Sequence, residues 1–199
     1  MNIVGKGIKK IDGMSITTGK PVYTDDLSAK DALVVKILRS PHAYAKIKDI
    51  DTSKAEMVDG VECVLTYKDV PKSRFTLAGQ TYPEPSPYDR LILEDVVRYV
   101  GDEVAIVAAI DEKTAIKAMN LIKVKYEVLT PVLDFEEAIG NKTMVHDEDR
   151  HCNFDIGMQR EKNIVSHHDY TKGDVEKVLS NCDVVIEETY YTQAQAHAM

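Results

Sequence analysis

Short strand-like stretches alternate with short helical stretches between residues 33 and 128, and this alternation constrains the fold more than any other feature. β-Branched and apolar residues give six stretches the composition of strands: 33–38, 45–50, 61–66, 96–100, 104–110 and 122–128. Helices are expected near residues 53–60 and 112–121. We therefore predict an α+β protein in which two β-α-β units, residues 45–66 and 104–128, contribute strands to a mixed sheet.

Local signals sharpen this prediction at three places. Ser53 and Glu56 have the spacing of a capping box, and Gly60 is suited to the left-handed conformation that ends a helix. Gly101 and Asp102 separate two strand-like stretches and can adopt the positive φ angles of a tight turn, which predicts a β-hairpin.

The two ends of the chain differ from the middle. Residues 1–32 are punctuated by glycine, residues 71–90 carry four prolines and predict a long loop, and residues 140–162 have the polar composition of a linker. A third unit is expected beyond this linker, with strands at 164–170 and 184–192 around a helix that opens at Gly173 and Asp174. About forty residues cannot complete such a unit, so we expect the chain to be a fragment.

Composition excludes several classes of function. The 199 residues carry 25 Lys and Arg against 33 Asp and Glu, and the formal charge of −8 argues against a nucleic-acid partner. No apolar run reaches the roughly 20 residues of a membrane helix and no signal peptide is visible, so we expect a cytoplasmic location. Cys63, Cys152 and Cys182 lie far apart, which indicates neither a disulfide framework nor a zinc or iron–sulfur cage.

Two short patterns have some features of ligand-binding sites. Gly5 and Gly7 lack the third glycine, the preceding strand and the following helix of a dinucleotide site. His146, His151 and Cys152 could ligate zinc, but a fourth ligand is missing. Both patterns are therefore more simply explained as loop residues.

The other histidines and the acidic residues do not indicate a metal-binding or catalytic site either. His167 and His168 are adjacent on a predicted strand, so their side chains would point to opposite faces and could not chelate one ion. The chain shows no nucleophile elbow, and no carboxylate pair stands out from its 33 acidic residues. We assign no catalytic, cofactor-binding or metal-binding residue to this chain.

The order of short motifs resembles the N-terminal α/β hammerhead region of the large, molybdenum-binding subunit in the xanthine dehydrogenase and aldehyde oxidase family. The matching residues are Thr18-Gly19-Lys20-Pro21-Val22-Tyr23, Leu38-Arg39-Ser40-Pro41-His42-Ala43, Thr66-x-x-Asp69-Val70-Pro71, Tyr99-Val100-Gly101-Asp102-Glu103-Val104-Ala105 and Tyr126-Glu127-Val128-Leu129. Asp102 and Glu103 stand where the family frequently has Gln-Pro. Gly173-Asp174-Val175, followed by Thr192 and His197, is similar to the start of the next, molybdopterin-binding domain.

The resemblance implies a domain plan and a parent enzyme. The plan is an arm at residues 1–16, the hammerhead domain at 17–139, a linker at 140–162 and the truncated start of the molybdopterin domain at 163–199. The parent is expected to hydroxylate a purine, a related heterocycle or an aldehyde with molybdenum–molybdopterin and to pass electrons to iron–sulfur clusters.

The resemblance also implies which polypeptides carry which cofactors. Iron–sulfur clusters and FAD would lie on other subunits or segments, which would be partners of this chain together with the rest of its own subunit and, in a homo-oligomer, further copies. The chain itself is expected to be an inactive scaffold that binds no cofactor. The alternative is a stand-alone, non-catalytic docking module for an iron–sulfur or flavin subunit.

Overall fold

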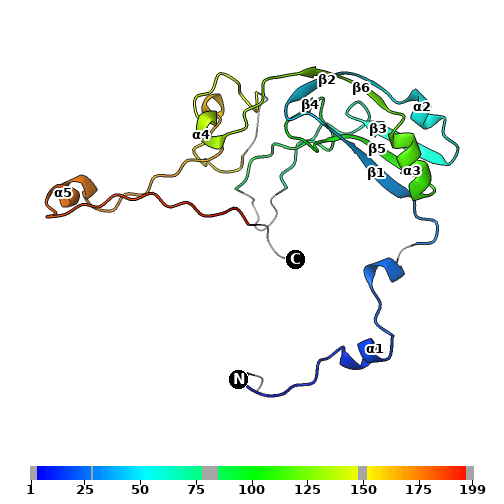
Figure 1. The fold of residues 1–199 in the computed structure, drawn as a ribbon, viewed down its shortest axis with the longest axis horizontal. Coiled ribbons are helices and arrows are strands. Elements are labelled where there is room, and N and C mark those ends of the chain that lie inside the picture. The colour runs from blue at the N-terminus through cyan, green and yellow to red at the C-terminus, as the bar shows by residue number, and fades with distance from the viewer. Residues whose placement is uncertain (1–3, 28, 78–84, 148–151, 196–199) are drawn as a thin grey trace.

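Two small antiparallel sheets form the body of the molecule. The computed structural model describes residues 4–27, 29–77, 85–147 and 152–195. Sheet A has the strand order β1 (Val34–Arg39), β5 (Glu103–Ala109) and β3 (Val61–Thr66). Sheet B has the order β4 (Val96–Val97), β2 (Ala45–Asp51) and β6 (Lys123–Val128). The α+β class predicted from the sequence is confirmed, with antiparallel pairing between all the described strands (Figure 1).

Sheet A is organised around its central strand. β5 pairs with β1 on one side and with β3 on the other, and Val104 and Val107 on it are completely buried. Helix α3 (Glu112–Met119) packs on β1 and β5 through Ala115 and Ala118, two small side chains that let helix and sheet approach closely. The core therefore lies beneath α3 and extends to sheet B.

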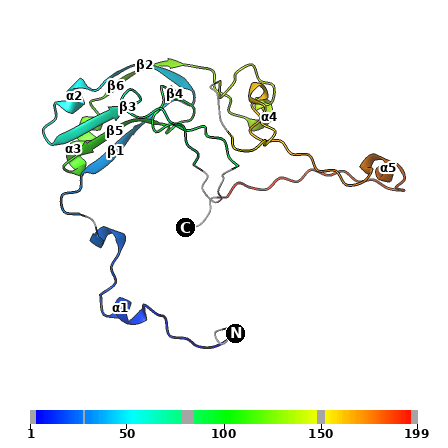
Figure 2. The same cartoon turned by 180° about the vertical axis from the view of Figure 1, so that it is seen from behind.

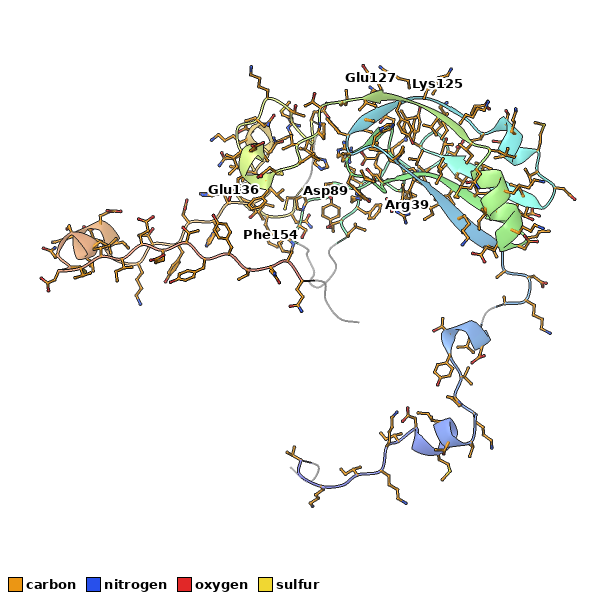
Figure 3. All side chains as sticks on the ribbon, viewed as in Figure 1. Arg39, Asp89, Lys125, Glu127, Glu136 and Phe154 are labelled. Atoms are coloured by element: carbon orange, nitrogen blue, oxygen red, sulfur yellow. The ribbon has the colours of Figure 1, made fainter. Side chains whose placement is uncertain are left out.

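Sheet B buries one face and exposes the other. Its inward-pointing residues on β2 are Ala45, Ile47 and Ile50. On the exposed face, Lys48 Nζ lies 2.5 Å from Glu127 Oε2, and Lys125 Nζ lies 3.3 Å from Asp49 Oδ2. Figure 3 shows Lys125 and Glu127 on the outer side of β6. We call these two cross-strand ion pairs the charge ladder; they lie along β6, an edge strand of sheet B.

The predicted β-α-β units are wrong in their pairing. Helix α2 (Ser53–Glu56) follows β2 of sheet B and leads to β3 of sheet A, and α3 follows β5 of sheet A and leads to β6 of sheet B. The elements themselves lie close to their predicted positions. Between β2 and β3, residues 52–60 are too few for a crossover to a parallel neighbour, which needs a dozen or more residues, so the chain passes to the other sheet.

The predicted hairpin at Gly101 is also wrong. Gly101 does have a positive φ of 99°, but β4 pairs with β2, and β5 pairs with β1 and β3. The Gly101 N–H donates to the Ser40 carbonyl at 2.8 Å, and the Arg98 N–H donates to Asp102 Oδ2 at 2.8 Å. Because these backbone groups bond elsewhere, they do not join a hairpin ladder.

The capping of α2 differs from the prediction at both ends: α2 ends at Glu56 with Met57 as its C-cap, so Gly60 has the predicted left-handed conformation but does not end the helix. Asp51 Oδ1 accepts hydrogen bonds from the N–H and the Oγ of Ser53, and Thr52 Oγ1 donates to Glu56. Ser53 is therefore inside the helix rather than its cap. Gly60 has a φ of 86°, and a Cβ there would lie 2.7 Å from Ile110 Cδ1, so both conformation and space favour glycine.

The segment before the body has little structure, as predicted. It contains α1 (Gly13–Thr17) and the 3-10 turn η1 (Thr24–Leu27), and none of its described side chains is buried. Figure 1 shows it leading away from sheet A.

The chain after the body ends in a projecting arm. α4 (Phe135–Ala138) and the 3-10 turn η2 (Arg160–Lys162) lie beside the body, and α5 (Val175–Ser180) lies at the far end of the arm (Figure 2). The predicted helix is confirmed, and Asp174 Oδ1 caps it by accepting from the Lys177 N–H at 3.1 Å. The predicted strands at 164–170 and 184–192 are wrong, because these described segments pair with no neighbouring strand and a lone strand has no ladder to satisfy its backbone.

Candidate functional site

The candidate site is a charged cavity at the end of sheet B. It has a volume of about 250 Å³ and opens between residues 89–94, residues 96–103 and the pair Val145–His146. Ion pairs link the charged residues in and around it, which we call the arginine–carboxylate cluster: Arg39, Arg74, Arg90, Arg98, Glu94, Asp102 and Glu103. None of the helices in the described part of the chain has the length and hydrophobicity needed to cross a bilayer.

Glu94 is the centre of one half of the cluster. One of its carboxylate oxygens lies 3.0 Å from Arg74 Nη1, and the other lies 2.6 Å from Arg98 Nη1. The side chains of Glu94 and Arg98 are only 14% and 11% exposed, so this pair is largely desolvated. A carboxylate bonded to two guanidinium groups in such surroundings is strongly held, since loss of either charge would leave the other poorly solvated.

Glu103 is the centre of the other half. It lies 3.0 Å from Arg39 Nη1 and 3.1 Å from Arg90 Nη2, and it accepts a hydrogen bond from the Tyr99 hydroxyl at 3.2 Å. Burial alone would raise the pKa of Glu103, but its hydrogen bonds and the nearby Arg39 charge outweigh burial, and the pKa is lowered. Glu103 therefore ties β1 to the segment that contains Arg90.

Asp102 behaves in the opposite way. It is 8% exposed, and burial raises its pKa, although the backbone N–H groups of Arg98 and Glu103 and the Arg90 charge act to lower it. Arg90 Nη2 lies 3.8 Å away, which is too far for a good hydrogen bond. The cluster thus contains two adjacent carboxyl groups whose environments push their pKa values apart.

The cluster is arranged to hold segments together rather than to react. Each of its three carboxylates is bonded to arginine or backbone groups of the same chain. Within the described ranges, no group of three or more His, Cys, Asp or Glu residues is placed to hold a metal ion. The arrangement supplies electrostatic attachment between sheet A, sheet B and the loop that ends at Arg90.

The two glycines weighed as a phosphate site lie in the exposed N-terminal segment. Gly5 has a φ of 80°, and a Cβ at either Gly5 or Gly7 would meet nothing within 4 Å. The first helix, α1, starts only at Gly13 and has five residues. These glycines therefore do not lead into a helix N-terminus.

The structure describes two of the three zinc-ligand candidates in the polar segment. His146 lines the charged cavity, and Cys152 Sγ donates to the Pro85 carbonyl at 3.0 Å. His151 lies outside the described residues, as does His197.

The His167 and His168 pair is exposed, and the predicted strand under it does not form. His167 Nδ1 lies 3.5 Å from an oxygen of Asp169. His42 instead packs edge-on against Tyr126, with ring centroids 4.8 Å apart, and burial raises the pKa of Tyr126.

Sequence reasoning missed the arginine–carboxylate cluster, although a signal was present. Arg90, Glu94, Arg98 and Asp102 follow one another at intervals of four residues with alternating sign. Such spacing is usually interpreted as a helix surface, but this segment contains only the two-residue strand β4. The charges gather through loop geometry, which the spacing alone does not reveal.

Residues 18–130 match the family described as the aldehyde oxidase and xanthine dehydrogenase a/b hammerhead domain, which is more than half of the chain. The chain belongs to this family. Its hammerhead domain contains both sheets, α2, α3 and the whole arginine–carboxylate cluster.

Two proteins of known sequence and one solved structure are similar to this chain. It is 39% identical to the probable hypoxanthine oxidase XdhD of Escherichia coli K12, with 98% of this chain and 23% of that protein aligned. It is 32% identical to the nicotinate dehydrogenase large molybdopterin subunit of Eubacterium barkeri, over 98% of this chain and 42% of that one. The Cu,Mo-CO dehydrogenase structure matches with a TM-score of 0.67 and 29% identity, over 90% of this chain and 23% of that chain. This hammerhead chain thus spans only part of its relatives.

Proposed function

We propose that this chain is the N-terminal scaffold of the large subunit of a molybdenum hydroxylase. The observation that carries the proposal is the alignment of nearly the whole chain with less than a quarter of a probable hypoxanthine oxidase, together with the hammerhead match over residues 18–130. The complete subunit would hydroxylate a purine, a related nitrogen heterocycle or an aldehyde. Molybdenum–molybdopterin, when bound, supplies the oxidation chemistry of such an enzyme.

The charged cavity is poorly suited to that anionic cofactor. The charged cavity has four arginines nearby, but their guanidinium groups already bond carboxylates or backbone carbonyls of the chain, and Glu94, Asp102 and Glu103 would repel a phosphate or other anionic group. We therefore propose that polypeptide outside the described residues binds the pterin, and we assign no reaction step to this chain.

The proposal also assigns partners. Iron–sulfur and FAD subunits or domains would receive the electrons, and the hammerhead domain would support the rest of the large subunit. Its fold suits this role, because the two sheets share one core and the cluster attaches the loop ending at Arg90 to sheet A.

The test compares the 199-residue chain with the complete subunit produced from the same gene. Both are purified after expression in cells that make the cofactor, and molybdenum and pterin are measured by elemental analysis and fluorescence. The complete subunit, assembled with its partners, should retain both and oxidise hypoxanthine, xanthine, nicotinate or an aldehyde with an artificial electron acceptor. Stoichiometric pterin on the short chain, or turnover by it alone, would refute the scaffold assignment.

A further inference from the structure

Asn163 has a left-handed backbone conformation, with φ 57° and ψ 27°. It is the only residue other than glycine with a positive φ, 57°, in the part of the chain that the structure describes. Asparagine tolerates this left-handed region better than most residues, yet the conformation still costs free energy. Residues around it must therefore hold it there.

The side chain of Asn163 makes three hydrogen bonds, all to backbone groups far back in the sequence. Its Oδ1 accepts from the Val145 N–H at 3.0 Å. Its Nδ2 donates to the Ala138 carbonyl at 3.0 Å and to the Thr143 carbonyl at 2.9 Å. One partly buried amide thus joins the end of α4 and the 143–145 segment to the turn at residue 163.

Val145 is held from its other side by the body. The Val145 carbonyl accepts from Arg98 Nε at 3.1 Å, and Arg98 is itself fixed by Glu94 at 2.6 Å in largely desolvated surroundings. The Arg98 side chain therefore reaches the same residue whose N–H bonds to Asn163. Arg98, Val145 and Asn163 form a continuous connection from sheet B to the turn, which we call the exit clamp.

The turn at Asn163 decides where the chain goes next. The backbones of Gln159 and Ile164 exchange two hydrogen bonds of 3.0 Å, and the His167 N–H donates to the Ile156 carbonyl at 2.9 Å. Beyond residue 167 the chain runs out into the arm that carries α5 (Figure 1).

We infer that the exit clamp sets the direction in which the chain leaves the hammerhead domain, and so positions the polypeptide that follows against it. This inference rests on the proposed function, since it concerns the large subunit that would continue beyond the arm. Arg98 and Asn163 are positioning residues in this view. They act through Val145 and touch no substrate.

The test uses the complete subunit with its partners and three variants. Asn163→Gly preserves the left-handed backbone, which glycine adopts freely, but removes all three side-chain bonds. Arg98→Lys keeps the charge beside Glu94 and removes the Nε donor to Val145. Asn141→Ala is the matched control, because Asn141 is an amide in the same segment whose bonds, to Glu137 and Thr143, are only local.

Two readouts distinguish the clamp from the proposed function. Amide hydrogen exchange at Val145, whose N–H bonds to Asn163 Oδ1, should rise about tenfold in Asn163→Gly, since a lost hydrogen bond of about 1.4 kcal/mol corresponds to a factor of ten. Activity per bound molybdenum should fall at least about tenfold in both Asn163→Gly and Arg98→Lys, because small misplacements of a reacting centre are costly. Asn141→Ala should show neither change.

The outcomes separate cleanly. Unchanged exchange in Asn163→Gly would refute the clamp, whatever the cofactor content. Raised exchange with wild-type activity per molybdenum would refute positioning of the following polypeptide, and equal losses in Asn141→Ala would do the same. If Asn163→Gly does not fold, Arg98→Lys decides the matter through the same two measurements. A wild-type subunit without molybdenum would contradict the proposed function, while the exchange result would still decide whether the clamp exists.

Discussion

Replacing Glu94 with glutamine should destabilise the chain strongly. Breaking a buried ion pair by removing one partner costs about 3–5 kcal/mol, because the remaining charge is left uncompensated. Glu94 neutralises both Arg74 and Arg98, but its side chain keeps 14% exposure and glutamine can still accept one hydrogen bond. We therefore expect the free energy of unfolding to fall by about 2–4 kcal/mol.

Equilibrium unfolding in urea measures this loss directly. With a urea dependence of about 1–3 kcal/mol per molar, the midpoint should move down by about 1 M or more. In an Arg98→Met background the same Glu94→Gln change should cost at least about 1 kcal/mol less, because one of its partners is gone.

An exposed ion pair supplies the matched control. Lys48 and Glu127 also lie 2.5 Å apart, but their side chains are 55% and 48% exposed. Glu127→Gln should therefore change the unfolding free energy far less than Glu94→Gln does. If Glu94→Gln cost no more than Glu127→Gln, the desolvation argument for the arginine–carboxylate cluster would be wrong.

Three more predictions follow from local geometry. The pKa of Glu103 is lowered in the folded state, so the ionised carboxylate stabilises the fold above its ordinary pKa of 4.5, and this stabilisation is lost as the pH falls through the folded pKa. Glu103→Gln should therefore reduce the fall of the unfolding free energy with decreasing pH, measured by urea unfolding at several acidic pH values. An unchanged pH dependence would contradict this prediction. Gly157→Ala would place a Cβ 2.2 Å from the His167 carbonyl, whereas a Cβ at Gly140 meets nothing within 4 Å at a similar φ. Protease cleavage between residues 156 and 167 should thus quicken in the first variant and much less in Gly140→Ala, and equal rates would count against the contact. Leu93→Ala removes a fully buried side chain beside the cavity and should lower the free energy of unfolding, measured by urea or heat, by about 2–5 kcal/mol. A decrease of less than about 1 kcal/mol would show that neighbouring side chains fill the space.

The strands and helices of the body could be predicted because each depends on local pattern. Val61–Thr66 was predicted without error, and the helix after Asp111 was placed within two residues of its observed end. Their partners could not be predicted. Whether a strand joins sheet A or sheet B depends on non-local pairing, and the periodicity of β2 and β3 is the same in either arrangement.

The arginine–carboxylate cluster could not be predicted from the sequence for the same reason. The interval of four between Arg90, Glu94, Arg98 and Asp102 was visible. The loop path, however, brings Arg74 to Glu94, and the pairing of β1 with β5 brings Arg39 to Glu103. Asparagine favours the left-handed region more than most residues, but Lys162 and Ile164 belong to no recognisable turn motif, so the sequence did not single out Asn163. Both features arise from contacts between distant segments.

The charge ladder bears on how the molecule behaves at high concentration. Among the strands that the structure describes, β6 pairs only with β2, and an edge strand with a free side can recruit a strand from another copy and start fibrils. Alternating Lys125 and Glu127 along it, each engaged with β2, would have to give up these partners and lose hydration before a second copy could align. We therefore expect the ladder, whose exposed ion pairs add little to folding stability, to hinder edge-to-edge pairing of copies at β6.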